Sequence, residues 1–395
     1  MPEPIAILSA KRTPIGAMLG DLSTVSSPQL GALAIRDALE SSGLTPNQID
    51  EVIMGCVLSA GLGQAPARQA AIAAGLNPST CCTTVNKVCG SGMNAVMSAC
   101  NALRSGQSEA MIAGGMENMS QAPHLLPQAR VGYRYGERPL LDHMQIDGLQ
   151  DAFKGQSMGQ FAEQCAAKYQ FSRADQDAFA LASLTRAKQA IDQGLFEQEI
   201  TPVSLANKKQ KVSIEHDQQP LSAKPEKIPT LPAAFVKDGT ITAANASSIS
   251  DGAAALVMMS ASKAQQQGLK PIALIHEYDQ AAHQPEWFTT APVTAIEKTL
   301  QRVGWKVEDV DLWEINEAFA VVPMAAMHEL GIAHEKVNIN GGACALGHPI
   351  GASGARIIVS LIHALRHTNG SRGVASLCIG GGEATAVALE LIKDD

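Results

Sequence analysis

Short apolar runs alternate with longer stretches of mixed apolar and polar residues over the first 118 positions. The runs have the length and flanking turn residues of buried strands, and the mixed stretches repeat their apolar positions at helical spacing. This alternation predicts a largely parallel sheet with helices on both faces. The predicted strands are 4–10, 51–58, 82–86 and 109–114, and the predicted helices begin at about 28 and cover 66–75 and 91–105.

The same alternation returns after position 270. Gly92 and Gly354 each lie just inside a predicted helix that leads to a glycine-ended strand, 22 positions before Gly114 and 26 before Gly380. One unit is therefore used twice, and the best site is expected where the repeats meet, at the carboxyl ends of the strands. The second half is predicted to contain strands at 271–278, 310–315, 336–340, 373–379 and 384–391, and helices at 292–303, 318–330 and 352–367.

A segment of different amino-acid composition separates the two halves. Residues 119–245 are rich in Pro, Gln, Tyr and charge, with two predicted helices, one near 159–169 and one from Ser172. Insertions of this length usually cover or bind something. We predict three domains: 1–118 with 246–268, the inserted 119–245, and 269–395.

Composition and charge exclude several classes of protein. Apolar residues make up 46% and charged residues 17% of the chain, which argues against disorder, and the net charge of −8 without a Lys/Arg block argues against nucleic-acid binding. No apolar run approaches the ~20 residues of a membrane span, and no secretion signal is expected at the start. Eight cysteines without a C-x-x-C pair predict a reducing, cytoplasmic location and no metal site.

Cys89 is the first candidate for chemistry. It lies between a predicted strand and a helix, in Val88-Cys89-Gly90-Ser91-Gly92, where the helix dipole and free backbone N–H groups favour a thiolate. The flanking glycines give a substrate close access. The alternative is a small buried cysteine beside glycines that the turn needs in any case.

Three further residues have both a functional and a structural interpretation. His348 lies in a loop rich in glycine, which is a poor packing site for a core histidine. Cys378 ends a strand before Gly380-Gly381-Gly382, whose N–H groups can form an anion nest, although it also fits an inward strand position. Asn316 lies between a predicted strand and a predicted helix, where an asparagine usually serves as the N-cap.

Four motifs together resemble the thiolase family, in order and at family-like spacing. They are Val85-Asn86-Lys87-Val88-Cys89-Gly90-Ser91-Gly92-Met93, Asn316-Glu317-Ala318-Phe319, Gly347-His348-Pro349-Ile350-Gly351 and Cys378-Ile379-Gly380-Gly381-Gly382. The resemblance covers essentially the whole chain. It implies an α/β fold with two similar βαβ halves, mixed central sheets and an inserted loop domain.

The resemblance also implies an activity. Thiolases join two acetyl-CoA molecules into acetoacetyl-CoA and CoA, or run this Claisen reaction backwards, with CoA thioesters as substrates and no cofactor. Cys89 would carry the acyl group, His348 would be its base, and Cys378 would move the α-proton of the second acetyl-CoA. One oxyanion site would use His348 with a water held by Asn316, and the other the N–H groups of Cys89 and Gly380.

The inserted segment resembles the family loop domain, which covers the pantetheine arm of CoA and contributes to a homotetramer. Two departures stand out: Ser157 replaces a common histidine, and Pro220 replaces an arginine near the CoA phosphates, a charge that Lys224 and Lys227 would supply. The further substrate-binding positions implied by the resemblance are Met158, Phe235, Ala243, Ser247 and Phe319.

Three alternatives share much of this pattern. A 3-ketoacyl-CoA thiolase of broader chain length in β-oxidation would have the same catalytic residues. A decarboxylating ketosynthase normally pairs its cysteine with two histidines, and Cys378 argues against it. A non-catalytic CoA-binding homologue would keep the fold without turnover.

Overall fold

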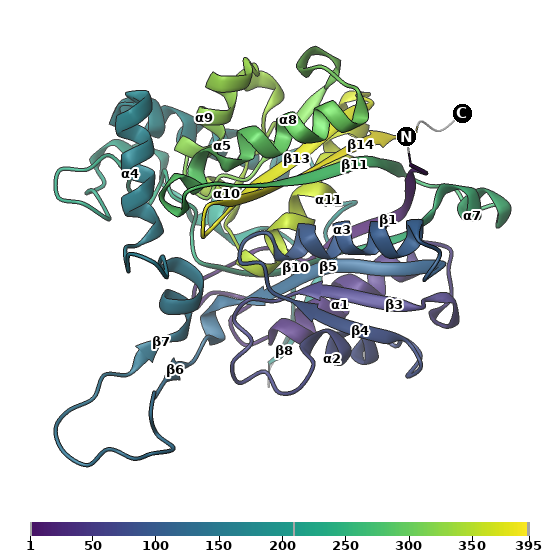
Figure 1. Ribbon diagram of the computed structural model, residues 1–395, viewed down its shortest axis with the longest axis horizontal. Helices are drawn as coiled ribbons and strands as arrows, with labels where there is room; N and C mark the ends of the chain where they lie inside the picture. The colour runs from purple at the N-terminus through teal and green to yellow at the C-terminus, as the bar shows by residue number, and fades with distance from the viewer. Residues whose placement is uncertain (1, 208–209, 393–395) are drawn as a thin grey trace.

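One mixed sheet of ten strands runs through the molecule in a computed structural model, which describes residues 2–207 and 210–392 (Figure 1). Its order is β12-β13-β14-β11-β1-β10-β5-β3-β4, with the short β2 beside β10. Two small hairpins, β6–β7 and β8–β9, lie outside it. The strands are β1 (Ile5–Arg12), β2 (Gly16–Ala17), β3 (Glu51–Gly55), β4 (Cys81–Val85), β5 (Ala110–Asn118), β6 (His124–Leu125), β7 (Leu141–Asp142), β8 (Val203–Asn207), β9 (Gln210–Ile214), β10 (Ser250–Ser260), β11 (Ala273–Ala282), β12 (Leu312–Ile315), β13 (Arg372–Ile379) and β14 (Glu383–Leu391).

The strand pairing repeats between the two halves. In the first half β3 is parallel to β4 and β5, while β5 and β1 each pair antiparallel with β10. In the second half β12 is parallel to β13, while β13 and β11 each pair antiparallel with β14. The halves join where residues 5–7 pair with 273–275. The prediction of a largely parallel sheet is therefore wrong, because each half contains an antiparallel strand between its parallel strands and its first strand.

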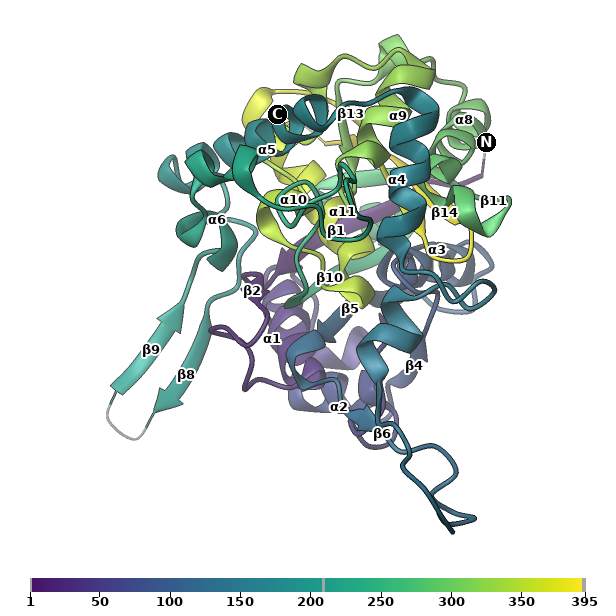
Figure 2. The same ribbon diagram turned by 90° about the vertical axis from the view of Figure 1, so that its left-hand side faces the viewer.

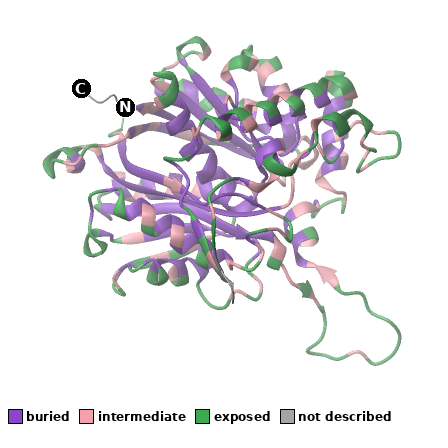
Figure 3. Ribbon diagram, turned by 180° about the vertical axis from the view of Figure 1, so that it is seen from behind, coloured by how far each residue is buried: buried purple, intermediate pink, exposed green. Residues whose placement is uncertain are grey.

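Helices α3 and α11 form a buried layer between the two halves of the sheet, and their apolar faces share one core with strands of both halves (Figures 1 and 3). Helices α1 and α2 cover the outer face of the first half, and α8 and α9 that of the second. The helices are α1 (Ser27–Glu40), α2 (Pro66–Ala73), α3 (Ser91–Arg104), α4 (Met158–Tyr169), α5 (Arg173–Asp192), α6 (Gln218–Ser222), α7 (Ala261–Gln266), α8 (Ala291–Val303), α9 (Val321–Leu330), α10 (Ala343–Leu346) and α11 (Ile350–Thr368).

The two central helices cross at a pair of glycines that are equivalent in the repeat. A Cβ built on Gly92 would lie 2.9 Å from the backbone nitrogen of Ala355, and one built on Gly354 would lie 2.4 Å from that of Met93. The two contacts are equivalent, because adding 262 (354 minus 92) to the number of a residue in the first half gives its counterpart in the second half. Only glycine permits so close an approach of two backbones.

The strands obey the same shift, which corrects the predicted alignment. Asp50 accepts the backbone N–H groups of Glu109 and Ala110, and a second aspartate, Asp311, accepts those of Ser371 and Arg372 in the other half. Ala110 therefore corresponds to Arg372, again 262 positions on. The predicted match of Gly114 with Gly380 is wrong by four positions, since a shift of 262 relates Gly114 to position 376. The two glycines have different roles in the two halves.

Two other differences concern single strands. The wholly buried β10 was not among the predicted strands, because it begins with Ser250-Asp251-Gly252, residues typical of a turn, directly after an irregular segment. The predicted strand 336–340 is only one parallel bridge between Trp313 and Val337. That bridge occupies the place that β4 has in the first half.

The inserted segment leaves the first half between β5 and β10, where the second half has only a tight glycine turn between β13 and β14. Figure 2 shows α4 and α5 beside the second half and the two hairpins extending away from the body. The predicted domain boundaries stay predictions, and residues 1, 208–209 and 393–395 within those domains lie outside the described residues. None of the helices in the described ranges is long and apolar enough to cross a membrane.

Candidate active site

Cys89 lies in a strained turn between β4 and α3. The preceding Val88 has a φ of 47°, a left-handed conformation that is rare for a β-branched residue and costs free energy. Ser91 braces the turn, because its Oγ accepts the Lys87 N–H at 2.8 Å and donates to the Val88 carbonyl at 2.6 Å. Strain of this kind persists where the surrounding structure holds a functional side chain in place.

The Cys89 thiol is neutral in the resting structure. Burial raises its pKa to about 11, against the opposing effect of the N–H groups of Gly380 and of Cys89 itself, and the Glu117 carboxylate raises it further. The expectation that the helix start favours the thiolate is therefore outweighed by desolvation. A nucleophile in this state needs a base.

Cys378 and Gly380 come to the Cys89 turn from the end of β13. Cys378 is 1% exposed, and its pKa is raised well above the ordinary value by burial and then by the neighbouring Cys89 sulfur. Gly380 lies beside Met158 and Val88, since a Cβ built on it would be in ordinary van der Waals contact with Met158 Cε and Val88 Cγ1, each 3.7 Å away. The structure thus brings together two thiols that are far apart in the sequence.

His348 is held by its own loop with one ring nitrogen left over. Its Nδ1 lies 2.6 Å from Ser353 Oγ, and the Ser353 hydroxyl donates to the Pro349 carbonyl at 3.0 Å. Because the Ser353 hydroxyl proton points to the Pro349 carbonyl, His348 Nδ1–H must donate to Ser353 Oγ, and Nε2 carries the lone pair. Burial, then the charge of Arg356, lowers the His348 pKa to about 3. Nε2 is buried without a hydrogen-bond partner among the described residues, as a base facing a substrate chamber would be.

Asn316 follows β12, and its backbone N–H donates to the Ser376 carbonyl at 3.0 Å. Its Oδ1 faces Arg356 Nη2 at 3.5 Å, which leaves Nδ2 buried and without a partner in the described part of the chain. Helix α9 begins only at Val321, with Ala320 as its N-cap. The N-cap interpretation of Asn316 is therefore wrong.

The predicted substrate-binding residues Met158, Phe235 and Phe319 belong to the apolar cluster that contains Cys378. Ser157 is the N-cap of α4 and uses its backbone N–H to bind Gln160 Oε1 at 2.9 Å. Met158 faces Gly380, and the Phe235 and Phe319 rings meet edge to face, with centroids 5.8 Å apart. In the adjoining segment the Ser247 N–H donates to the carbonyl of Ala318, 2.9 Å away.

Lys224, Lys227 and Ala243 lie further out and line a pocket of about 240 Å³. Cys344 is also in its wall, and the Cys344 Sγ lies 3.6 Å from the backbone oxygen of Glu317, beside Asn316. The predicted binding residues therefore divide into an apolar inner group and a cationic outer group. Two lysines in a protein of net charge −8 give the outer pocket the charge that a phosphate group needs.

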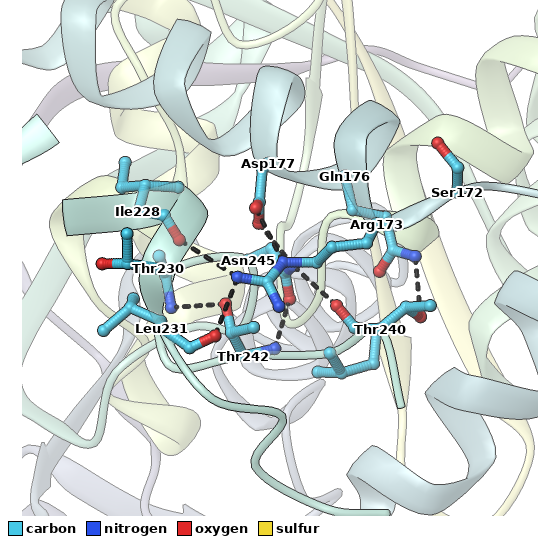
Figure 4. Close-up of polar contacts among 12 residues, drawn as sticks. Ser172, Arg173, Gln176, Asp177, Ile228, Thr230, Leu231, Thr240, Thr242 and Asn245 are labelled. Carbon is cyan, nitrogen blue, oxygen red and sulfur yellow. Dashed lines mark hydrogen bonds and ion pairs between the residues drawn. The ribbon is translucent and has the colours of Figure 1, made fainter. Parts of the chain in front are cut away.

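A polar clasp, formed by Arg173 and Asp177 of α5, holds the covering segment, residues 228–245, against that helix (Figure 4). Arg173 Nη2 donates to the carbonyls of Ile228 and Leu231 at 3.1 and 2.9 Å, while its Nε pairs with Asp177 at 2.7 Å. The other oxygen of Asp177 accepts from Asn245 Nδ2 at 3.0 Å. Both ends of the stretch that carries Phe235 and Ala243 are thereby fixed to one helix.

The comparisons with known proteins agree over the whole chain. Residues 5–262 match the family model of the thiolase N-terminal domain, and residues 269–391 match that of the thiolase C-terminal domain. This chain belongs to the thiolase family. The resemblance and the fold class predicted for this thiolase are thus confirmed.

Relatives of this thiolase are similar at nearly full length. An acetyl-CoA acetyltransferase of Chromobacterium violaceum is 48% identical over 393 residues, covering 98% of this chain and 99% of the relative. A thiolase of Ascaris suum in complex with coenzyme A has a TM-score of 0.94 at 43% identity, covering 99% of this chain and 100% of that one. The Bacillus anthracis acetyl-CoA acetyltransferase has a TM-score of 0.96 at 40% identity, covering 99% of each chain.

Sequence reasoning missed the buried polar residues that support the thiolase site. Glu317 accepts hydrogen bonds from Ser183, Asn338 and the Cys344 N–H, which ties the Asn316 loop to the His348 loop. Arg356 is buried in α11 and faces Asn316. A charged residue inside the apolar stretch 350–365 was the available signal, because such residues are rarely buried without a partner. The described residues contain no group of three His, Cys, Asp or Glu side chains placed to hold a metal ion.

Proposed function

We propose that this thiolase is an acetyl-CoA C-acetyltransferase, which condenses two acetyl-CoA to acetoacetyl-CoA and CoA and catalyses the reverse thiolysis. The observation that carries the chemistry is the meeting of the Cys89 and Cys378 thiols beside the Gly380 N–H. The choice of acetyl-CoA rests on relatives named acetyl-CoA acetyltransferase, including those of Chromobacterium violaceum and Cupriavidus necator, each 48% identical over 98% of this chain.

In the first half of the reaction Cys89 takes the acetyl group. His348 Nε2 accepts the thiol proton, the sulfur attacks the thioester carbonyl, and the proton leaves with CoA. The N–H groups of Cys89 and Gly380 face the Cys89 sulfur, where they can hold the oxyanion of the tetrahedral intermediate. A neutral His348 with a free Nε2 suits this role, because an imidazolium could not accept the proton.

In the second half Cys378 gives its proton to His348 Nε2, and the thiolate so formed removes the α-proton of a second acetyl-CoA. The resulting carbon nucleophile attacks the acetyl group on Cys89. The bond to Cys89 breaks, and its sulfur leaves as a thiolate that takes the proton back from His348 Nε2. His348 Nε2–H and a water bound by Asn316 Nδ2 hold the enolate oxygen. Loss of one such donor typically costs about 10²–10³ in kcat. The raised pKa of Cys378 makes its thiolate a strong base.

Two measurements test this proposal. Incubation with acetyl-CoA alone should place one acetyl group on Cys89, as seen by peptide mass spectrometry. A wild-type protein that gives no adduct would instead be a non-catalytic CoA-binding homologue. Thiolysis should be faster with acetoacetyl-CoA than with 3-ketohexanoyl-CoA, and a clear preference for the longer substrate would make it a 3-ketoacyl-CoA thiolase of β-oxidation.

We also propose that the enzyme is a cytoplasmic homotetramer that works in fatty acid metabolism. All eight cysteines are free, which supports a reducing compartment. The loop between β6 and β7 extends from the body and exposes 78% of Val131 and 95% of Tyr135 (Figure 1). Apolar residues exposed on an extended loop support contact with another subunit.

A further inference from the structure

Glu117 is a buried carboxylate that the reaction described above does not use. It lies near the end of β5 and is 0% exposed. A carboxylate withdrawn from water in this way persists only where other groups compensate its charge. Glu117 is compensated by backbone N–H groups from two separate segments.

The bonds of Glu117 join three parts of the active-site framework. Oε2 accepts the N–H of Val57 at 3.0 Å and that of Gly351 at 2.9 Å, and Oε1 accepts that of Leu58 at 3.1 Å. The Cys56 thiol lies 3.8 Å from Oε1. The carboxylate therefore connects the end of β5, the loop after β3 and the start of α11.

The residue that binds Glu117 at the start of α11 has a counterpart in the first half of the repeat. Gly351 is the counterpart of Cys89 under the shift of 262 positions that relates Gly92 to Gly354. Both residues stand at the start of a central helix, where backbone N–H groups attract negative charge. In the first half this place holds the reacting sulfur, and in the second half the Glu117 carboxylate occupies it.

We propose that Glu117 is a positioning residue for acyl transfer: its carboxylate fixes the start of α11, and with it His348, against the strand ends beside Cys89. Gly351 is three residues from His348, so that a shift of its backbone moves the imidazole. The inference rests on the proposed function, because it assigns to Glu117 the alignment of the base with the nucleophile. Misplacement of a base by about 1 Å can cost about 10²-fold in rate.

Glu117 also acts on the active site through its charge. It raises the pKa of Cys89, whose other neighbours include Cys378 and the N–H groups of Gly380 and Cys89. Burial raises the pKa of Glu117 itself to about 7, against the N–H groups of Val57, Leu58 and Gly351. A charge change at Glu117 should therefore be detectable at Cys89.

Two variants separate position from charge. Glu117→Gln keeps the size of the side chain, removes the charge and turns an amide NH₂ toward N–H donors. Glu117→Asp keeps the charge and withdraws the carboxylate from Gly351. The control is Asp50→Asn, because Asp50 also accepts two backbone N–H groups, at 2.7 and 3.1 Å, but at the opposite end of β5.

Two readouts are measured on the full-length enzyme: kcat and KM for acetoacetyl-CoA thiolysis, and the pH dependence of Cys89 alkylation by iodoacetamide. We expect both Glu117 variants to lose about 10- to 100-fold in kcat, with KM within about twofold. The alkylation midpoint should move to lower pH in Glu117→Gln and stay in place in Glu117→Asp. Asp50→Asn should change neither readout.

A Glu117→Gln enzyme with wild-type kcat would overturn the inference, as would an equal loss in Asp50→Asn. If Glu117→Gln does not fold, Glu117→Asp decides, and an undiminished kcat in that variant rejects the positioning role. The alkylation profile needs no turnover. A wild-type protein without thiolase activity would therefore refute the proposed function while the effect of Glu117 on the thiol was still measurable.

Discussion

At the scale of single residues, the active site is built from groups that are neutral at rest. Burial raises the pKa of Cys89 to about 11 and lowers that of His348 to about 3. A thiol and an imidazole with these values do not form an ion pair spontaneously at neutral pH. Proton transfer between them must therefore be coupled to attack on the bound thioester, where backbone N–H groups receive the developing charge.

Removal of the Cys378 thiol should impair condensation but not acetylation of Cys89. Cys378→Ala retains the nucleophile and its oxyanion donors, so we expect acetylation of Cys89 by acetyl-CoA within about threefold of wild type. Condensation should fall by about 10²–10⁴, the usual contribution of a proton-transfer group. Mass spectrometry of the acyl-enzyme and a coupled assay of acetoacetyl-CoA measure the two steps.

Cys165→Ala is the matched control for that variant. Cys165 is fully buried in the same apolar cluster as Cys378, so its removal makes a similar cavity without touching the proposed proton transfer. We expect it to lose stability and keep its condensation rate. Full condensation by Cys378→Ala would show that another group moves the α-proton.

At the scale of elements, every predicted catalytic side chain stands where a strand ends or a helix begins. Cys89 follows β4, Asn316 follows β12, Cys378 lies near the end of β13, and His348 precedes α11. Rigid strands fix the backbone up to the reacting atoms, and the turns beyond them supply free N–H groups. The covering segment has less regular structure and depends on the Arg173 clasp.

Arg173→Lys should weaken CoA binding more than catalysis. Lysine keeps the charge but cannot reach Asp177 and the two carbonyls of Ile228 and Leu231 with one planar fork. We expect KM for acetyl-CoA to rise by about tenfold, which corresponds to about 1.4 kcal/mol, with kcat within about twofold. Initial-rate kinetics and titration with CoA measure the effect.

Arg68→Lys provides a control of the same kind. Arg68 also binds two carbonyls, those of Thr80 and Pro78 at 2.9 and 2.8 Å, but outside the inserted segment. Its replacement should leave KM unchanged. A KM for Arg173→Lys equal to that of wild type would show that the covering segment is held without the clasp.

At the scale of the whole molecule, the sequence predicts the duplication and most elements but not the sheet. Glycines and hydrophobic periodicity mark the helices and strand ends, which suffices to place Cys89 and His348 just before the two central helices and Cys378 near the end of a strand. Strand direction depends on partners distant in sequence, and the inserted segment hides that β10 returns antiparallel to β5. The supporting residues Glu117 and Arg356 were missed for a similar reason, since their partners lie in other segments.

The proposed tetramer makes a prediction at the same scale. The 15 residues 126–140 connect β6 to β7, and they expose Val131 and Tyr135 together with three arginines at 130, 134 and 138. Residues so exposed contribute little to the stability of one subunit, but they can bury apolar area against another. Val131→Ser with Tyr135→Ser should therefore lower the mass in solution from four subunits to two, measured by light scattering after size exclusion. The monomer fold should remain intact, with an unchanged circular dichroism spectrum.

Val212→Ser is the control for the double variant, because Val212 is 43% exposed in β9, on the other hairpin. A wild-type mass of four subunits that the double variant leaves unchanged would place the tetramer contact elsewhere, and a smaller wild-type mass would reject the tetramer itself.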